Sequence, residues 1–421
     1  MFRYFLLPAI CLLAITAATA QKKFINPFDT AIHVMDKHPE NYLLPVKALE
    51  STKPDTSDHF AYGYWLQAAM TYESFLGDYE KTLFYSDARY NDELSTHKME
   101  CDTAFVKKHI LVNAADYITA QAKQNQVVMI NEAHHLPFHR AFVLPMLKKF
   151  YDAGYRYLAI ETLGDSSINQ KEYPDYLTGY YTHEPLFGEF IREALKLHFK
   201  LIKYESEVQC DGKGKDSQYC NRFRDSMMAV NLNKAFKADP KAKMLIYAGY
   251  DHIHEGTETG WKKMAQFFKE LTGIDPFTVE LTRQAGHLYA ELNTKEYNAV
   301  NNLKHITEPV IALQNNQPWH QDFVDATVIF PVYLSKYRRP SFYSIGGLRK
   351  YYSLNKFGLK DGEYIQAFYK NEKPGNRIPA DQYAANVTSG ERCLYLFKGE
   401  YIIEIKDPAG NLLRKNEVTI N

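Results

Sequence analysis

Apolar and polar residues alternate in blocks through the middle of the chain. An apolar run at residues 127–130 ends in a polar turn, a helical pattern of apolar positions begins at Pro137, and Gly154 precedes a second apolar run at residues 155–160. Short apolar runs bounded by turns predict buried strands, whereas apolar positions three and four apart predict a helix. This stretch therefore predicts a strand–helix–strand unit whose two strands lie parallel.

The same alternation continues along the chain and predicts further elements. Strands are expected at residues 201–204, 244–247, 277–281, 309–313 and 326–330, and helices at residues 186–199, 219–236 and 261–271. Strands that alternate with helices are typical of α/β proteins. We therefore expect a parallel-sheet core with helices on both faces.

The pattern changes on either side of this core. Residues 59–90 resemble a single tetratricopeptide-type helical hairpin with no second copy, which indicates a helical arm or cap, not a binding solenoid. Near the end, alternating runs at residues 401–406 and 412–420 predict a β-hairpin. The chain divides into a signal peptide (1–20), an N-terminal helical region (21–120), an α/β core (121–336) and a C-terminal β-rich region (337–421).

The beginning of the chain has the features of an export signal. Arg3 precedes an apolar stretch at residues 5–15, and Ala18 and Ala20 form a small-residue cleavage site before Gln21. No later segment approaches the roughly 20 apolar residues that a membrane-spanning helix needs. We expect an exported protein, periplasmic or extracellular, with no transmembrane segment.

Charge and cysteine content limit the expected partners and indicate one disulfide. Lys plus Arg and Asp plus Glu both number 50, a balance that predicts no nucleic-acid partner and leaves the protein partner open. In an oxidising compartment, Cys210 and Cys220 are the natural disulfide pair, because they bracket a polar loop. Asn386 begins a formal glycosylation sequon.

Ionisable side chains follow four successive predicted strands. They are Glu132, His134 and His135 after the first, Glu161 after the second, Glu205 after the third, and His252 and His254 after the fourth. The carboxyl ends of parallel strands lie along one edge of a sheet, where α/β proteins bind ligands. The pattern therefore predicts a functional site at that edge.

Two chemistries suit such a cluster. In the first, one imidazole is the general base for a water or alcohol, a carboxylate fixes its tautomer, and a second imidazole stabilises the oxyanion or protonates the leaving group. In the second, two histidines and one or two carboxylates bind a divalent metal that lowers the pKa of its water. Spacing alone does not choose between them.

The chain resembles the erythromycin esterase-like family. The resemblance rests on four ordered motifs, NEAHH (131–135), LAIE (158–161), RDSMMAVN (224–231) and AGYDH (248–252), and covers about residues 125–255. The wider superfamily includes haem-uptake lipoproteins of the ChaN type and metal-dependent TIKI-like peptidases. The resemblance implies an α/β fold and an exported hydrolase that acts on an ester or related acyl bond of a small-molecule substrate without a required cofactor.

The resemblance also implies roles for individual residues. The catalytic base corresponds to His135, its supporting carboxylate to Glu161, the second histidine to His252 and the turn acid to Glu132. In the haem-binding and metal-dependent branches the corresponding histidine is one place earlier, at His134. Two departures stand out: Asn131 replaces the turn glycine, and Gly249 and Tyr250 replace a His-Asn pair.

Other residues near the motifs have open roles. Arg224, Glu205 and His254 are candidate substrate contacts, although Arg224 equally suits a buried pair with Asp225 and the other two suit solvent-exposed positions. His139 is expected on the protein surface, and the Tyr-rich loop at residues 173–181 is a candidate pocket wall.

The absence of a Gly-x-Ser-x-Gly motif favours direct attack by water over a serine nucleophile. The alternatives are a divalent-metal-dependent hydrolase, a haem- or iron-binding uptake protein with His134 as the metal ligand, and a binding module that uses its helical arm.

Overall fold

The computed structural model describes residues 24–90, 94–258, 260–336, 339–385 and 392–421. The predicted signal peptide and the sequon at Asn386 lie outside these residues. No helix in the described ranges is long and apolar enough to cross a membrane.

The centre of the molecule is a nine-stranded sheet with the strand order β1-β9-β11-β8-β2-β5-β3-β4, and β10 pairs with β9. Strands β2, β5, β3, β4, β8 and β11 run parallel, whereas β9 and β1 join antiparallel at one end. The strands are β1 (Ile110–Asn113), β2 (Val127–Glu132), β3 (Tyr157–Ile160), β4 (Lys200–Lys203), β5 (Met244–Gly249), β8 (Phe277–Glu280), β9 (Val310–Gln314), β10 (Gln317–Pro318) and β11 (Ala326–Ile329).

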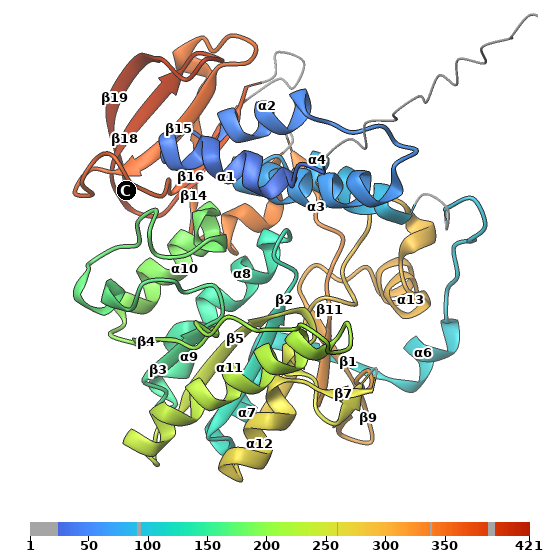
Figure 1. Cartoon of the computed structure of the whole chain (residues 1–421). Coiled ribbons are helices and arrows are strands. Elements are labelled where there is room, and N and C mark those ends of the chain that lie inside the picture. The colour runs from blue at the N-terminus through green and yellow to red at the C-terminus, as the bar shows by residue number, and fades with distance from the viewer. Residues whose placement is uncertain (1–23, 91–93, 259, 337–338, 386–391) are drawn as a thin grey trace, which may run out of the picture.

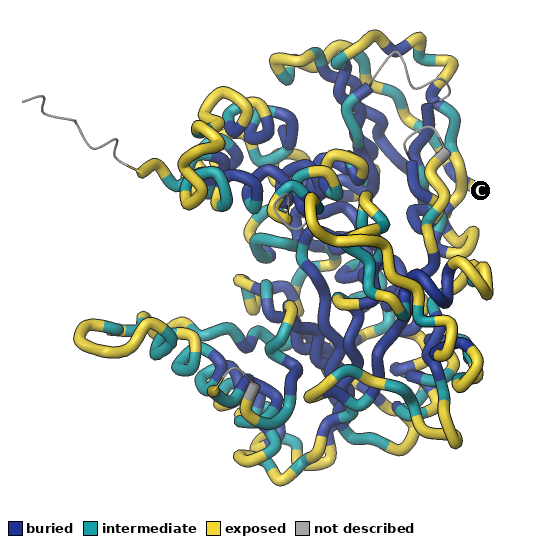
Figure 2. Tube along the Cα trace, turned by 90° about the vertical axis from the view of Figure 1, so that its right-hand side faces the viewer, coloured by how far each residue is buried: buried dark blue, intermediate teal, exposed yellow. Residues whose placement is uncertain are grey.

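Helices cover both faces of this sheet (Figure 1). One face packs against α7 (Ala114–Gln124), α8 (Pro137–Val143), α9 (Leu147–Asp152) and α10 (Pro185–Lys196), and the other against α11 (Tyr219–Ala238) and α12 (Met264–Thr272). Successive residues of a strand point to opposite faces, so Val128 lies in the first core and Val127 in the second. The predicted α/β fold with a parallel-sheet core is confirmed, and Figure 2 shows its strands as the buried centre.

The helix expected after Pro137 is interrupted. It consists of α8, a 3-10 turn at Leu144–Met146 and α9. Pro145 lies at the start of that turn. Proline has no backbone N–H to donate and clashes with the preceding helical turn, so a regular α-helix cannot run through it.

The N-terminal helices pack against the C-terminal strands (Figure 1). These helices are α1 (Pro27–Lys37), α2 (Leu43–Ser51), α3 (His59–Leu76) and α4 (Tyr79–Asp87). Tyr364 of the C-terminal region lies in one cluster with Ala31 and Tyr72, and Arg377 forms an ion pair with Glu40 at 2.9 Å. The two ends of the chain therefore share one apolar core.

The C-terminal region contains an antiparallel sheet in the order β16-β15-β18-β19. Strands β18 and β19 pair as the predicted hairpin. The bounds of the C-terminal strands are β14 (Lys350–Ser353), β15 (Tyr364–Tyr369), β16 (Asp381–Ala384), β17 (Cys393–Leu396), β18 (Gly399–Lys406) and β19 (Leu412–Ile420). The remaining short elements include α6 (Thr103–Lys108), α13 (Lys295–Lys304), β6 (Thr257–Glu258), β7 (Trp261–Lys262), β12 (Ser335–Lys336) and β13 (Arg339–Pro340).

Candidate active site

The strand order brings the predicted site residues together. Strand β5 lies between β2 and β3, so the carboxyl end of β5 is flanked by Glu132 of β2 and by Glu161, which follows β3. Both carboxylates are buried. The edge of the sheet where the sequence predicted a site therefore holds two buried acids, one on each side of Gly249.

Glu132 belongs to a buried ion-pair network. Arg140 of α8 donates from Nε and Nη2 to the two Glu132 oxygens at 2.7 and 2.6 Å, and from Nη1 to Glu184 at 3.1 Å. Burial alone would raise the pKa of Glu132, but Arg140 and His134 hold that pKa at about 2. Glu132 is therefore ionised at neutral pH and acts only as a hydrogen-bond acceptor.

His134 lies in the middle of the cluster. Its Nδ1 is 2.9 Å from Glu132 Oε1, and its ring stacks on Tyr181 with the ring centroids 3.8 Å apart. On its other side, Nε2 is 4.0 Å from Glu161 Oε1. Because the ionised Glu132 only accepts hydrogen bonds, His134 Nδ1 is the donor in this contact, and Nε2 is the atom that faces Glu161.

Glu161 connects His134 to a second set of polar residues. Its Oε1 accepts a hydrogen bond from Arg224 at 2.6 Å, and its Oε2 accepts one from the backbone N–H of Gly249. Burial would raise the pKa of Glu161, but His252, His134 and Arg224 lower it to about 2. Glu161 is therefore a fixed negative charge at neutral pH.

His252 is oriented by α11. Asp225 Oδ1 lies 2.6 Å from His252 Nδ1, and Arg224 donates to His252 Nε2 at 2.8 Å. Both contacts are satisfied when the proton is on Nδ1. Although burial opposes it, Glu161 and Asp225 raise the pKa of His252. Arg224 also binds Glu205, and so joins the ends of β3, β4 and β5.

His135 lacks the contact with the Glu161 carboxylate that was expected of it. Among the described residues its polar contacts are Ser86 Oγ at 3.2 Å and Tyr250 OH at 3.4 Å, and it makes no hydrogen bond to Glu161. Burial lowers the pKa of His135 to about 3, with further lowering by nearby cationic and imidazole groups. The expected support of His135 by Glu161 is therefore corrected, because the turn points His134 at Glu161 instead.

The surface position expected for His139 is wrong. Its side chain is fully buried, accepts a hydrogen bond from the N–H of Ala133 at 3.1 Å, and has its pKa lowered to about 3 by burial. Every residue of α8 is buried, so this helix has no polar side for His139 to occupy.

His254 lies beside the cluster in a separate network. It is buried, and its Nε2 is 3.2 Å from Glu280 at the end of β8. Asn131 donates to Glu280 at 2.6 Å and to the Tyr250 carbonyl at 2.6 Å. Asn131 therefore ties β2 to the turn after β5.

The predicted disulfide between Cys210 and Cys220 is present, with its Cα atoms 5.6 Å apart. It closes a loop that follows Glu205 and leads into α11 one turn before Arg224. The disulfide thus restrains the loop between the two members of the Glu205–Arg224 ion pair.

Two contributors to the cluster, Arg140 and Glu184, were not predicted from the sequence; a charged residue in an apolar helix was the available signal for Arg140. Tyr181 ends the Tyr-rich loop that the sequence suggested as a pocket wall, and it stacks on His134. Within the described residues, no group of three or more His, Cys, Asp or Glu side chains is arranged to hold a metal ion. The carboxylates at the centre are engaged by Arg140 and Arg224.

Comparisons with known proteins do not identify a family for the chain. No protein-family model and no curated protein matches the chain. Similar solved structures include the type III effector HopBA1, with 13% identity and a TM-score of 0.28 over 41% of this chain and 84% of that chain. A structure described as bacterial protein toxins has 12% identity and a TM-score of 0.30, over 56% of this chain and 52% of that one.

A further similar structure is RRSP, a MARTX toxin effector domain from Vibrio vulnificus CMCP6. Its identity is 10% and its TM-score 0.30, over 61% of this chain and 62% of that one. The chain thus spans less than two thirds of two of these three proteins. Similarity this low carries no argument about function.

Proposed function

We propose that the chain is an exported hydrolase in which His134 activates a water molecule against an ester or related acyl bond of a small molecule. One observation carries the proposal. The Nε2 atoms of His134 and His252 lie 4.0 and 3.7 Å from the same oxygen, Glu161 Oε1. Two imidazoles that converge on one carboxylate at the edge of a parallel sheet are suited to acid–base catalysis.

The proposed hydrolysis begins with a proton transfer to His134. His134 Nε2 takes a proton from water, whose oxygen attacks the acyl carbon, and Glu132 stabilises the imidazolium that forms. Arg224 offers positive charge and hydrogen bonds to the oxyanion. His252, held by Asp225 through Nδ1 and accepting from Arg224 at Nε2, positions that guanidinium. When the carbon–oxygen bond to the leaving group breaks, the His134 imidazolium returns its proton to the leaving alkoxide, and the carboxylic acid and alcohol are released.

His134 replaces His135 as the proposed base for a physical reason. A useful base has a pKa near the working pH and an oriented lone pair. His135 has its pKa held at about 3 and no carboxylate partner in the described structure, whereas Glu132 orients His134. The proposal keeps Glu132, Glu161 and His252 in the site, moves the base by one residue, and gives the task of orienting the base to Glu132.

The resemblance to the erythromycin esterase-like family supports this reaction class. The motifs that carry it contain Glu132, Glu161, Arg224 and His252, and all four meet in the cluster. The disulfide supports export, because disulfides persist in oxidising compartments.

The test compares His134→Ala with His135→Ala on a panel of p-nitrophenyl esters, with circular dichroism as the check on folding. We expect His134→Ala to lower kcat by about a thousandfold, in line with loss of a general base, and His135→Ala to retain most of the activity. A folded His134→Ala protein with unchanged kcat would contradict the proposal. The reverse pattern would return the base to His135.

Metal dependence is tested on the same wild-type protein. We expect turnover to be unchanged after dialysis against EDTA. Loss of activity that zinc, manganese or cobalt restores would favour the divalent-metal-dependent hydrolase. An iron-containing protein with a Soret band would favour haem uptake.

A further inference from the structure

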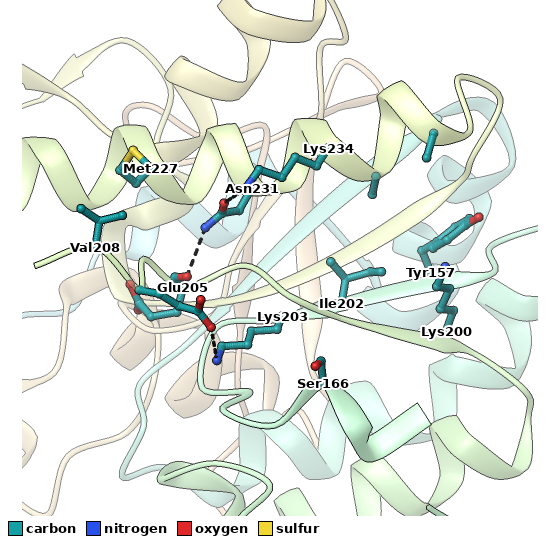
Figure 3. Close-up of a pocket in the computed structure, with 13 residues that line it drawn as sticks. Tyr157, Ser166, Lys200, Ile202, Lys203, Glu205, Val208, Met227, Asn231 and Lys234 are labelled. Carbon is teal, nitrogen blue, oxygen red and sulfur yellow. Dashed lines mark hydrogen bonds and ion pairs between the residues drawn. The ribbon is translucent and has the colours of Figure 1, made fainter. Parts of the chain in front are cut away.

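A groove of about 500 Å³ lies beside the cluster, between α11 and β4 (Figure 3). Its volume falls within the range of small-molecule sites, about 300 to 1,000 Å³. Strand β4 is the last strand of the parallel sheet, so the groove follows the free edge of the core.

The groove is elongated, and apolar side chains make up part of its lining. Ile202 of β4 and Met227 and Ala235 of α11 are among the apolar residues that line it. Met227 and Ala238 both line the groove, and at 1.5 Å of rise per residue they lie about 16 Å apart along the helix axis. A long groove with apolar side chains along its lining suits an extended chain better than a compact ring.

One end of the groove reaches the proposed catalytic cluster. Glu205 lines this end and forms an ion pair with Arg224, which donates a hydrogen bond to Glu161 at 2.6 Å. Arg224 therefore lies between the groove and the two imidazoles. An acyl chain that extends from His134 to the groove must therefore pass Arg224.

The charges differ between the two ends. At the end near the cluster, Glu205 is paired with Arg224, and Glu207 with Lys203 at 2.6 Å. Farther along, Lys234 donates to Asn231 at 2.8 Å.

Lys200 lies 5.7 Å from the ring centroid of Tyr157, at the far end in Figure 3. Neither Lys200 nor Lys234 has an ion pair with any residue that the structure describes. Lys203 and, to a smaller extent, Lys234 lower the pKa of Glu207. The groove therefore combines apolar lining residues with two ammonium groups that have no direct ion pair among the described residues.

We propose that this groove binds the acyl chain of the substrate, and that the chain is apolar and carries an anionic group, a carboxylate or phosphate, that Lys200 and Lys234 bind. The inference rests on the proposed hydrolase function and adds the substrate class to it. An extended peptide paired with β4 fits less well. The side chain of Asn169 already exchanges two hydrogen bonds of 2.8 Å with the N–H and C=O of Leu201 on this edge.

The first test measures binding without turnover. Isothermal titration of the full-length mature protein with dodecanoate, kept below its micelle concentration, is compared with dodecyltrimethylammonium, which has the same chain and the opposite charge. We expect saturable one-to-one binding of dodecanoate that weakens with added salt, and at least about tenfold weaker binding of the cation. Equal binding of the two amphiphiles would overturn the assignment of the anionic group.

Two variants localise the binding. Ala235→Trp fills the groove and is expected to weaken dodecanoate binding at least about tenfold, because the chain loses its buried contacts. The double variant Lys200→Glu and Lys234→Glu leaves the apolar lining residues unchanged. It is expected to weaken dodecanoate binding about fivefold, which is the scale of two partly exposed ion pairs.

The matched control is Ala120→Trp on α7, which is also a helical alanine beside a hollow of about 500 Å³ flanked by lysines. It is expected to bind dodecanoate as the wild type does. Binding that neither groove variant weakens, or that the control weakens equally, would overturn the proposal.

Failure of this inference and failure of the proposed function give different results. If the groove is wrong but the hydrolase is right, Ala235→Trp hydrolyses short and long p-nitrophenyl esters with the wild-type preference. If the hydrolase is wrong but the groove is right, no ester is turned over and dodecanoate still binds in the groove. His134→Ala should lose turnover and keep dodecanoate binding, which separates the two sites within one protein.

Discussion

Gly249 leaves the space that the His134 imidazole occupies. A Cβ atom at residue 249 would lie 2.5 Å from His134 Cε1, closer still to Nε2, and 3.0 Å from Glu161 Oε2. The backbone at Gly249 has φ −87°, which any residue adopts, so glycine is required here for space and not for conformation. The absence of a side chain at Gly249 is therefore coupled to the position of His134.

Gly249→Ala should displace His134 from Glu161. A misplacement of about 1 Å at a catalytic group costs on the order of a hundredfold, so we expect kcat for ester hydrolysis to fall by about that factor. Enzyme kinetics and a thermal melt measure the result. The control is Gly63→Ala in α3, where a Cβ meets no atom within 4 Å and kcat should not change. Full activity in Gly249→Ala would show that the imidazole position is not needed.

Arg140→Met should destabilise the protein strongly. Arg140 is completely buried between Glu132 and Glu184, and its loss leaves both carboxylates without their cation. Breaking a buried ion pair costs about 3 to 5 kcal/mol, which urea unfolding can measure. Lys148→Met is the control, because the Lys148–Asp152 pair is exposed and contributes at most about 1 kcal/mol. Similar losses in both variants would contradict this account of the network.

Stability should fall as the pH is lowered from about 6.5 to 3. Burial holds the pKa of His135 and of His139 at about 3, below the ordinary value of 6.5. In this window the unfolded chain binds protons at these positions and the folded chain does not, so unfolding is favoured by about 1.4 kcal/mol per pH unit for each histidine. Glu132 and Glu161 add to the loss between pH 4.5 and 2, because their folded pKa values are also depressed.

The variant His139→Asn tests the origin of this acid sensitivity. Asparagine retains an oxygen that can accept from the N–H of Ala133 but does not titrate. The free energy of unfolding, measured with urea between pH 7 and 5, should therefore depend less steeply on pH than in the wild type. The difference in slope should correspond to about one proton fewer taken up on unfolding. An unchanged slope would mean that His139 is not the neutral, buried group that the structure describes.

Reduction of the disulfide should loosen the loop before α11. The crosslink closes a loop with a sequence separation of 10, for which the lost chain entropy is worth about 2 to 3 kcal/mol. We expect trypsin to cleave at the exposed Lys213 and Lys215 faster after reduction, as measured by mass spectrometry. The double variant Cys210→Ser and Cys220→Ser should be cleaved at the same sites without reductant. Equal cleavage of the oxidised and reduced wild type would contradict the prediction.

The sequence alone determined the α/β core and the edge where the site lies. Buried strands such as β2 and β5 are continuous apolar runs, and that signal is local to each segment. Parallel topology then places the residues after those strands along one edge, which is why Glu132, Glu161, Glu205 and His252 could be grouped before any contact was known. The Cys210–Cys220 pair was equally predictable, because both cysteines flank one short loop.

Only the tertiary structure decided which histidine faces the cluster. His134 and His135 are neighbours in one turn, and their side chains point in different directions that depend on the turn and on the Tyr181 and Ser86 contacts from distant segments. The sequence pattern also could not predict the burial of His139 and Arg140. Helix α8 is covered on all sides, whereas hydrophobic periodicity identifies only helices that have one exposed face. Hydrophobic pattern is a property of each segment, whereas the direction of a polar side chain at the site is set by partners that the fold brings from elsewhere in the chain.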